Sequence, residues 1–368
     1  MRLILVQTVK TFVCVSLLFG LLVGVSFLVV PAEPASDILD TRIAEASIYS
    51  TQTKYLSFTR GALVAPRPRV LVMGASNANV GLRPFEIQTD VPCASVSNLA
   101  VGNANVTEIR QIVDLVHDVQ SPDARSQNTF VFGTWFGLFS DSRDRWPNSS
   151  RDPPETDMEA ELYRYGFYYR AADRPQPRLS AAWLPVEGIL IRPFIATEVV
   201  ARQLTDGLRG YFFVRRPKRT DAEREAVHFG EEDRREATTY WYNLMGRKDD
   251  ISADEFTSLE NLIDRLLDAH EKVVVVDLPL PKWNQKVSVY DSKYRQRLPG
   301  LLKKFAGREG FAFSDLSGLS TDDDEYSDEV HPKPHLAKLW AEHVGKTAKS
   351  VACPVVNSAL AGQAGKKQ

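Results

Sequence analysis

A serine that directly follows a buried apolar run is the first candidate for chemistry in this sequence. Ser76 stands in Gly74-Ala75-Ser76-Asn77, immediately after the apolar residues 70–73. α/β proteins place their functional groups at the carboxyl ends of parallel strands, and glycine allows a tight turn there. Ser76 could therefore be a nucleophile, with Asn77 beside it in contact with substrate. A serine that only caps the next helix would show the same pattern.

A histidine with a nearby carboxylate is the second candidate. Of the six histidines, His331 lies at a predicted boundary between a loop and a helix, and Asp328 precedes it by three residues. A carboxylate in this position can orient an imidazole and stabilise its protonated form. His331 could then accept the proton of a serine hydroxyl. Ser76, His331 and Asp328 together would make a catalytic triad.

The acidic run that contains Asp328 has other interpretations. Residues 322–329 are typical of a solvated loop, or of a weak cation site. His331 and His335 are four residues apart, which could suggest a pair of metal ligands. Pro332 and Pro334 disfavour a regular helix between them. We therefore expect no metal ion, and nothing in the sequence indicates another cofactor.

A turn rich in glycine and asparagine is the third candidate. The run Val101-Gly102-Asn103-Ala104-Asn105 follows a predicted strand and precedes a predicted helix. Backbone N–H groups of such a turn, or an asparagine amide, can stabilise an oxyanion. Gly102, Asn103 and Asn105 are the candidates for this role. An ordinary turn between a strand and a helix has the same composition.

The elements that would position these residues alternate along the chain. Short apolar runs predict strands, and apolar residues at helical spacing predict helices. The expected strands cover 70–73, 94–101, 129–132, 273–278 and 311–313, and the clearest helices cover 106–119, 252–270 and 335–350. This order predicts an α/β fold with a doubly wound, mainly parallel sheet in three layers, of the flavodoxin type.

The composition changes along the chain and suggests four parts. We expect a membrane anchor over 1–35, a polar stem over 36–67, an α/β domain over 68–352 and a frayed tail over 353–368. The domain would contain a long, partly helical insertion over 140–250. This insertion is rich in charged and aromatic residues, and we expect it to cover part of the sheet rather than to fold independently.

The anchor is predicted from an uncharged run of 20 residues. Residues 11–30 match the thickness of a bilayer core, and Arg2 and Lys10 precede them. Positive charge before the span places the N-terminus in the cytoplasm. We expect a single-pass protein of the inner (cytoplasmic) membrane with its domain in the periplasm. A cleaved signal peptide is the alternative, with a small-residue site at 30–32.

Two features of the insertion have both a packing and a functional interpretation. The apolar segment 184–208 could pack on the core or lie on a membrane surface. The aromatic residues could stack on sugar rings or simply pack the insertion onto the sheet. They are Trp146, Tyr163, Tyr165, Tyr168, Tyr169 and Trp183.

The net charge and the cysteines indicate which partners and which compartment to expect. The net charge of −2 provides no basic excess for phosphates, so we expect no nucleic-acid partner. Cys93 and Cys353 are the only cysteines outside the predicted span. An oxidising compartment would permit a disulfide between them, which would fasten the C-terminal segment to the sheet.

The three candidate stretches, in this order, resemble the SGNH/GDSL hydrolase superfamily. Gly74 to Asn77 is similar to its serine block, with Ala75 in place of an aspartate; residues 98–102 are similar to its glycine block; and Asp328 to His331 matches its final DxxH. The resemblance covers about 68–140 and 270–350. Trp135 stands where the family has an oxyanion asparagine, and we expect it to contact substrate.

This departure leaves the source of the oxyanion donors open. Asn103 or Asn105 could replace the missing amide, or the backbone N–H groups of Ser76 and Gly102 could suffice. With the anchor and the insertion, the layout resembles the membrane-anchored, exported branch that includes alginate O-acetylation and D-alanyl-lipoteichoic acid transfer proteins.

The resemblance implies a serine-dependent transfer of an acyl group, acetyl in the first place, to a polysaccharide or other cell-surface polymer. A membrane-bound protein could supply the acyl group. The alternatives are an SGNH carbohydrate esterase and a catalytically silent scaffold in a complex that modifies or exports polysaccharide. The loss of the asparagine favours the scaffold, whereas the presence of the serine, aspartate and histidine favours an enzyme.

Overall fold

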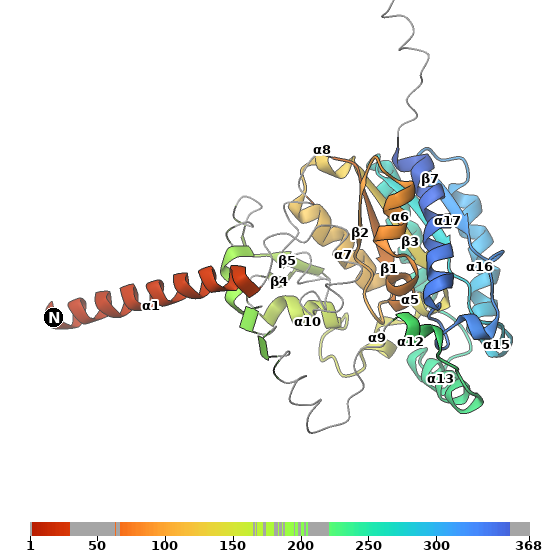
Figure 1. Ribbon diagram of the computed structural model, residues 1–368, viewed down its shortest axis with the longest axis horizontal. Helices are drawn as coiled ribbons and strands as arrows, with labels where there is room; N and C mark the ends of the chain where they lie inside the picture. Colours follow the sequence, from red (N-terminus) through yellow and green to blue (C-terminus); the bar gives the residue numbers. More distant parts are fainter. Residues whose placement is uncertain are drawn as a thin grey trace, which may run out of the picture.

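A five-stranded parallel sheet forms the centre of the computed structural model (Figure 1). The strands are β1 (Arg69–Gly74), β2 (Ser95–Asn98), β3 (Asn128–Thr134), β6 (Lys272–Asp277) and β7 (Phe311–Asp315). Their order is β2-β1-β3-β6-β7, which is the 2-1-3-4-5 order of flavodoxin-type sheets. The structure describes residues 2–29, 63, 67–164, 166, 168–171, 174–179, 183, 186, 188–194, 196–197, 200–201, 204 and 221–353.

The strand sequences explain why the sheet is parallel and central. Every residue of β1 and of β3 is buried, because helices cover both faces and leave no polar side of the kind that an antiparallel sheet can show to water. β2 is shorter than the expected strand over 94–101. The backbone still contacts β1 beyond Asn98, since the N–H groups of Leu99 and Val101 donate to the Val72 and Gly74 carbonyls at 2.8 and 3.0 Å.

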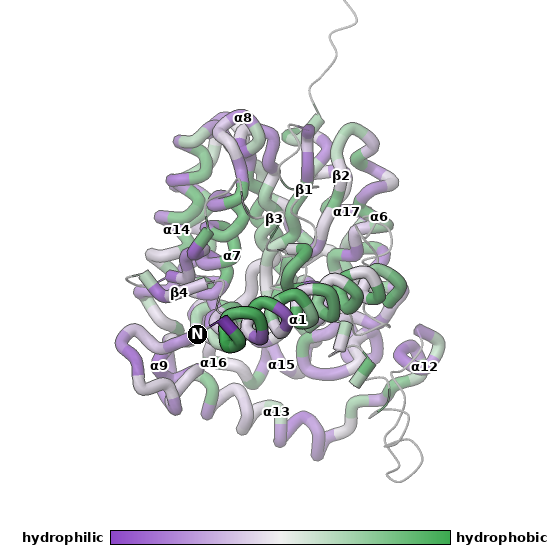
Figure 2. The backbone as a smooth tube through the Cα atoms, turned by 90° about the vertical axis from the view of Figure 1, so that its left-hand side faces the viewer, coloured by the Kyte–Doolittle hydropathy of each residue, from purple (hydrophilic) through white to green (hydrophobic). Residues whose placement is uncertain are grey.

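Helices lie on both faces of the sheet, which confirms the expected α/β class (Figure 2). On one face α6 (Pro84–Asp90) packs against α17 (Pro334–Ala352), and on the other α7 (Val106–Val119) packs against α14 (Ala253–Asp268). α7 has the predicted bounds. α14 begins after Ser252, whose hydroxyl accepts the Glu255 N–H.

The N-terminal helix α1 (Arg2–Val29) extends from the body of the protein (Figure 1). It is long and apolar enough to cross a membrane, and its surface is almost uniformly hydrophobic beyond the first turns (Figure 2). It begins before the expected residue 11 because residues 3–6 are also apolar. The proposed stem and tail lie outside the described residues, apart from single positions at their ends.

Some of the inserted elements lie at the end of the sheet that carries the candidate residues. After η1 (Phe136–Phe139) come α9 (Ser142–Arg145), α10 (Asp157–Arg164), the antiparallel pair β4 (Tyr168–Ala171) and β5 (Arg174–Pro177), α12 (Asp221–Glu225) and α13 (Glu231–Leu244). The pair β4–β5 packs on α7 and α10, whereas α13 contacts both α9 and α15 (Lys282–Val287). Trp241 of α13 packs edge-on against Trp135, with ring centroids 4.8 Å apart.

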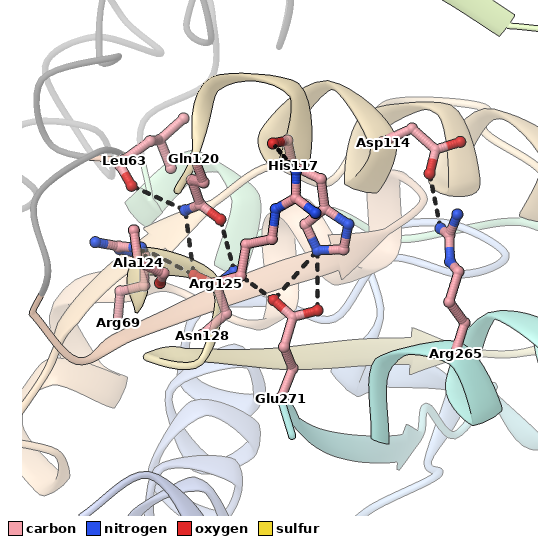
Figure 3. A network of polar contacts seen from close by, with 10 residues as sticks. All are labelled: Leu63, Arg69, Asp114, His117, Gln120, Ala124, Arg125, Asn128, Arg265 and Glu271. Atoms are coloured by element: carbon pink, nitrogen blue, oxygen red, sulfur yellow. Dashed lines mark hydrogen bonds and ion pairs between the residues drawn. The ribbon is translucent and has the colours of Figure 1, made fainter. Parts of the chain in front are cut away.

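A buried polar network closes the opposite end of the sheet, where the strands begin (Figure 3). The carboxylate of Glu271 lies 2.9 Å from Nε2 of His117 and accepts the Asn128 amide at 2.7 Å. Asn128 in turn exchanges hydrogen bonds with Gln120 and accepts one from Arg69. The network joins α7 to the starts of β1, β3 and β6.

A disulfide joins Cys93, just before β2, to Cys353, just after α17, with 5.7 Å between the two Cα atoms. This is the pairing that the sequence suggested. It fastens the last helix of the domain to the edge strand of the sheet. His331 lies immediately upstream of α17, at the opposite end of this helix from the bond.

Candidate active site

Four of the candidate residues, Ser76, Asn103, Trp135 and His331, line a pocket of about 310 Å³ at the carboxyl ends of the strands. The chain passes from β1 to β2 on one side and then returns to β3 on the other, so the strand order reverses beside β1. Ligands of open α/β sheets bind at such a reversal. The pocket is lined by Ala75, Ser76, Asn103, Ala104, Trp135, Arg145, Tyr240, Trp241, Glu329, Val330 and His331.

Ser76 is brought to the pocket by a close fit between β1 and the short helix α5 (Ser76–Gly81). Gly74 has φ +149°. A Cβ at Gly74 would lie 2.6 Å from that of Ala78, and a Cβ at Gly133 would lie 2.8 Å from it. Both glycines therefore let α5 sit directly on β1 and β3. A serine that caps a helix accepts a backbone N–H, but the Ser76 hydroxyl makes no hydrogen bond within the described residues. Ser76 lines the same pocket as His331.

His331 and Asp328 form a tight pair in the loop before α17. Nδ1 of His331 lies 2.7 Å from Oδ2 of Asp328, and Oδ1 of Asp328 accepts the backbone N–H groups of Val330 and His331 at 3.0 and 2.8 Å. The carboxylate is thus held from three directions. With Nδ1 occupied, Nε2 is the ring nitrogen that can act as a base.

The ionisation of the pair agrees with this role. Burial works to lower the pKa of His331, but the hydrogen bond and charge of Asp328 outweigh it and raise the pKa above its ordinary value. Burial likewise works to raise the pKa of Asp328, and the bond to His331 lowers it below the ordinary value. The carboxylate stays ionised and stabilises the imidazolium that a proton transfer would create.

No hydrogen bond joins Ser76 to His331 in the described part of the chain. The two residues line the same pocket, whereas a base that is ready to act lies within about 3 Å of the hydroxyl. Catalytic hydrogen bonds are often long before substrate binds and shorten in the complex. The structure therefore brings the three residues together and forms one of the two contacts of a triad.

Asn103 is the oxyanion candidate that reaches the pocket. Its backbone has φ 63°, the left-handed region that asparagine tolerates. Its Oδ1 accepts hydrogen bonds from Arg145 at 2.8 Å and from the Tyr240 hydroxyl at 3.3 Å. Both donors hold the oxygen, so the amide nitrogen Nδ2 remains as a donor, without a partner in the described residues.

The other two oxyanion candidates have different positions. Asn105 is fully buried and caps α7: its Oδ1 accepts the Glu108 N–H, and its amide nitrogen donates to Ser140, Ser142 and Glu255. Its amide is therefore committed to a structural network. Gly102 lies in the same exposed turn as Asn103 but does not line the pocket, and a Cβ there would meet nothing.

The two residues predicted to contact substrate, Asn77 and Trp135, also have different positions. Asn77 is fully buried, its side chain accepts the Ala78 N–H, and it does not line the pocket. Trp135 does line the pocket, and it is only 2% exposed. Its indole N–H is buried and has no hydrogen-bond partner among the residues that the structure describes. Gly137 makes room for this ring, since a Cβ there would lie 2.4 Å from it.

Sequence reasoning missed four residues of the pocket. Tyr240 and Trp241 form an aromatic wall on α13, and Arg145 and Glu329 add charge. The guanidinium of Arg145 is buried and donates to Ser140 Oγ, to the Gly137 carbonyl and to both oxygens of Asn103. It therefore positions the Asn103 turn. Glu329, next to Asp328, was the only one of the four with a signal in the sequence.

The aromatic residues singled out in the insertion lie elsewhere. Trp146 lines a separate pocket of about 460 Å³, which shares Arg145 with the first one. Tyr168 is buried, and the Tyr163 hydroxyl donates to Glu159. Tyr169 and Trp183 are exposed, and Tyr165 lies outside the described residues. In the Ser76 pocket, the aromatic residues available to stack on a substrate are Tyr240, Trp241 and Trp135.

The acidic loop before His331 pairs with basic groups. Asp322 contacts Lys282, Asp323 contacts Arg234, and Asp324 contacts His228. His335 binds Glu225 of α12 at 2.7 Å through Nδ1. Among the residues that the structure describes, no three His, Cys, Asp or Glu side chains are grouped as metal ligands would be. The loop thus holds α13, which lines the pocket, and His335 holds α12.

No family model matches this chain, and no curated protein matches it. The resemblance to the SGNH/GDSL superfamily therefore rests on the residues themselves. The arrangement combines a serine hydroxyl, a histidine with its carboxylate, an amide donor and an aromatic wall around one pocket. These are the groups that nucleophilic attack by a serine and stabilisation of an oxyanion require.

Proposed function

We propose that this protein is a serine-dependent acyltransferase of the SGNH type. The observation that carries the proposal is that Ser76 and His331 line one pocket at the carboxyl edge of the sheet and that His331 is paired with Asp328. A serine hydroxyl needs an adjacent base to become a nucleophile, and the base needs a fixed tautomer. Asp328 fixes that tautomer by holding Nδ1.

The reaction has two steps with the same groups. Ser76 Oγ attacks the acyl carbonyl, its proton passes to Nε2 of His331, and the leaving alcohol takes that proton as the acyl-enzyme forms. An acceptor hydroxyl then attacks the acyl carbon, gives its proton to Nε2, and Ser76 recovers it. The side-chain amide of Asn103 and the backbone N–H of Ser76, both from residues that line the pocket, are the candidate donors to the oxyanion.

Two further observations favour a saccharide acceptor outside the cytoplasm. Tyr240, Trp241 and Trp135 surround the pocket with rings of the kind that stack on sugars, and rings that exclude water help an alcohol to compete with it. The Cys93–Cys353 disulfide suits an oxidising compartment. α1 would hold the domain at the inner membrane, where a membrane-bound protein could supply the acyl group.

A partitioning experiment tests the proposal. The full chain in lipid nanodiscs is given an activated acetyl ester and an oligosaccharide acceptor, and acetylated sugar and free acetate are measured together. We expect acetylated sugar to increase with acceptor concentration, and both products to disappear in Ser76→Ala. Free acetate alone at every acceptor concentration would leave an esterase. No product, with polymer still bound, would leave a scaffold.

A further inference from the structure

A second part of the surface is more hydrophobic than a water-facing surface usually is. Seven large apolar side chains between residues 183 and 204 are exposed, Trp183 by 58% and Phe194 by 52%. The other five are Val186, Ile189, Leu190, Val200 and Leu204. Only four of these 22 sequence positions are charged. Large apolar side chains exposed in such number within one short segment are typical of an interaction site.

The packing of this segment against the body does not account for its apolar surface. Ile191, Pro193 and Ala196 already face inward and are buried, whereas Ile189 and Phe194 face outward. A helix that is apolar on both faces needs an apolar environment on both. By contrast, α13 in the same insertion exposes mainly charged residues in its first half, as a water-facing helix does.

The segment lies against the end of the candidate membrane helix (Figure 1). The guanidinium carbon of Arg192 is 3.9 Å from the ring centroid of Phe27, in the last turn of α1. Ser26 is only 1% exposed, and Val29 packs against the core of the domain. The apolar surface of α1 and that of residues 183–204 are therefore continuous.

The length of α1 places this contact at the membrane surface. The uncharged part of α1, residues 11–29, has 19 residues and rises about 28 Å at 1.5 Å per residue, close to the roughly 30 Å of a hydrocarbon core. A span that begins after Lys10 thus ends at Val29. Arg192, which contacts the turn that contains Phe27, lies at the same level.

We propose that the exposed apolar residues that the structure describes between positions 183 and 204 dock on the lipid bilayer, with their side chains in the boundary between headgroups and acyl chains. The occupant is a lipid surface, because the patch continues the surface of a helix that itself requires lipid. Tryptophan and arginine are typical residues of this boundary. The proposal rests on α1 spanning the membrane. It adds a second attachment that restricts rotation of the domain about α1.

Nitroxide accessibility in nanodiscs tests the proposal with three labelled forms of the full chain. Cys14 in α1, an exposed free cysteine, reports on the span. Phe194→Cys, with Cys14 replaced by serine, reports on the patch. Phe85→Cys on α6, also with Cys14 replaced, is the matched control, since Phe85 is 61% exposed on another surface. The measured quantity is the accessibility to oxygen relative to a water-soluble nickel chelate.

We expect the ratio to be highest at Cys14, severalfold higher at position 194 than at position 85, and water-like at position 85. A lipid-like Cys14 with equal ratios at 194 and 85 would overturn the docking and leave the anchor intact. Protection of position 194 from both reagents would show a protein contact, such as a second copy, and would also overturn it. A water-like Cys14 would overturn the anchor and the docking together.

A second measurement needs no cysteine. Brominated lipids should quench a fluorescence component that disappears in Trp183→Phe, because Trp183 is the most exposed tryptophan of the described chain. Equal quenching of the parent chain and of Trp183→Phe would contradict the docking. Neither measurement depends on catalysis, so the acyltransferase proposal can fail without affecting this result.

Discussion

The two ends of the central sheet each hold a histidine paired with a carboxylate, and the pairs have different surroundings. At the amino ends of the strands His117 contacts Glu271 at 2.9 Å, among Asn128, Gln120 and Arg69 (Figure 3). At the carboxyl ends His331 contacts Asp328 at 2.7 Å, beside a pocket that contains Ser76. The contact distances are similar, so the environment decides the role.

The difference follows from the topology of the fold. At the amino end, amides and a guanidinium enclose Glu271, which is 1% exposed, and they join α7 to three strands. At the carboxyl end, the chain leaves β1 and β3 in different directions and opens a space between them. Such an opening leaves Nε2 of His331 available to a substrate.

The largest expected effect comes from exchanging each histidine for glutamine. His331→Gln removes the base, and we expect the turnover of an activated aryl ester to fall by about 10⁴-fold or more. His117→Gln should retain turnover and lower the melting temperature instead. The measurements are ester hydrolysis and thermal unfolding of both variants. A similar loss of turnover in the two would remove the distinction between the ends.

The next test replaces the carboxylate of each pair, Asp328 and Glu271, by the corresponding amide. Asp328→Asn leaves the His331 tautomer unfixed, and we expect turnover to fall by about 10³ to 10⁴-fold. Glu271→Gln should leave turnover unchanged and destabilise the fold by about 1–3 kcal/mol, since it disturbs a buried hydrogen-bond network. Chemical denaturation gives the second value. Turnover that survives Asp328→Asn would contradict the proposed pair.

Asp328→Asn should also change the pH dependence of activity. His331 must be neutral to accept a proton, and Asp328 raises its pKa above the ordinary value. Activity of the parent chain should therefore fall with decreasing pH at a midpoint above about 6.5. In Asp328→Asn the two larger causes that raise the pKa of His331 are gone, whereas burial, which lowers it, and the weaker charge of Glu329, which raises it, remain. The midpoint of the residual activity should then move to lower pH, and an unchanged midpoint would implicate another group.

Asn103 and Asn105 lie in one turn, and their alanine variants distinguish a role in the pocket from a role in stability. Asn103→Ala removes a donor of the pocket, and we expect kcat to fall by about 10² to 10³-fold with little change in stability. Asn105→Ala removes the cap of α7 and should cost about 1 kcal/mol or more of stability, with a smaller effect on kcat. Steady-state kinetics and denaturation of both variants decide between them. The opposite result would assign the oxyanion role to Asn105.

The disulfide is expected to act on stability alone. Cys93→Ser with Cys353→Ser opens a closure of 260 residues, and we expect a loss of about 2–5 kcal/mol. Because the bond lies at the far end of α17 from His331, turnover at low temperature should stay within about twofold. Denaturation and kinetics of the double variant measure the two effects. A large loss of kcat in a fully folded variant would show that the bond also positions His331.

Local patterns were enough to predict much of this structure. Apolar runs predicted the five strands of the sheet, and helical spacing predicted α7 to the residue. Ser76 and His331 were predicted as candidates because each lies at the end of a recognisable element, and the structure places both at one pocket. The pairing of His331 with Asp328 needed only three residues of separation, so that the sequence already contained the contact.

The rest of the pocket depends on contacts that no local pattern contains. Tyr240 reaches Asn103 across 137 residues, and Arg145 reaches it across 42. Asn103 and Asn105 have the same side chain, and the backbone decides which one faces the pocket: Asn103 has a left-handed φ of 63° and Asn105 is extended. Asn77 follows the serine directly, yet the helical turn directs its side chain into the core.

Covalent labelling with a fluorophosphonate tests the central claim most directly. The full chain in nanodiscs is treated with the reagent, and the modified residue is identified by mass spectrometry of its peptides. We predict one adduct, on Ser76, that is lost in His331→Gln and retained in His117→Gln. Absence of an adduct in the folded parent chain, or equal labelling of Ser76 in both variants, would contradict an active serine at the carboxyl end of the sheet.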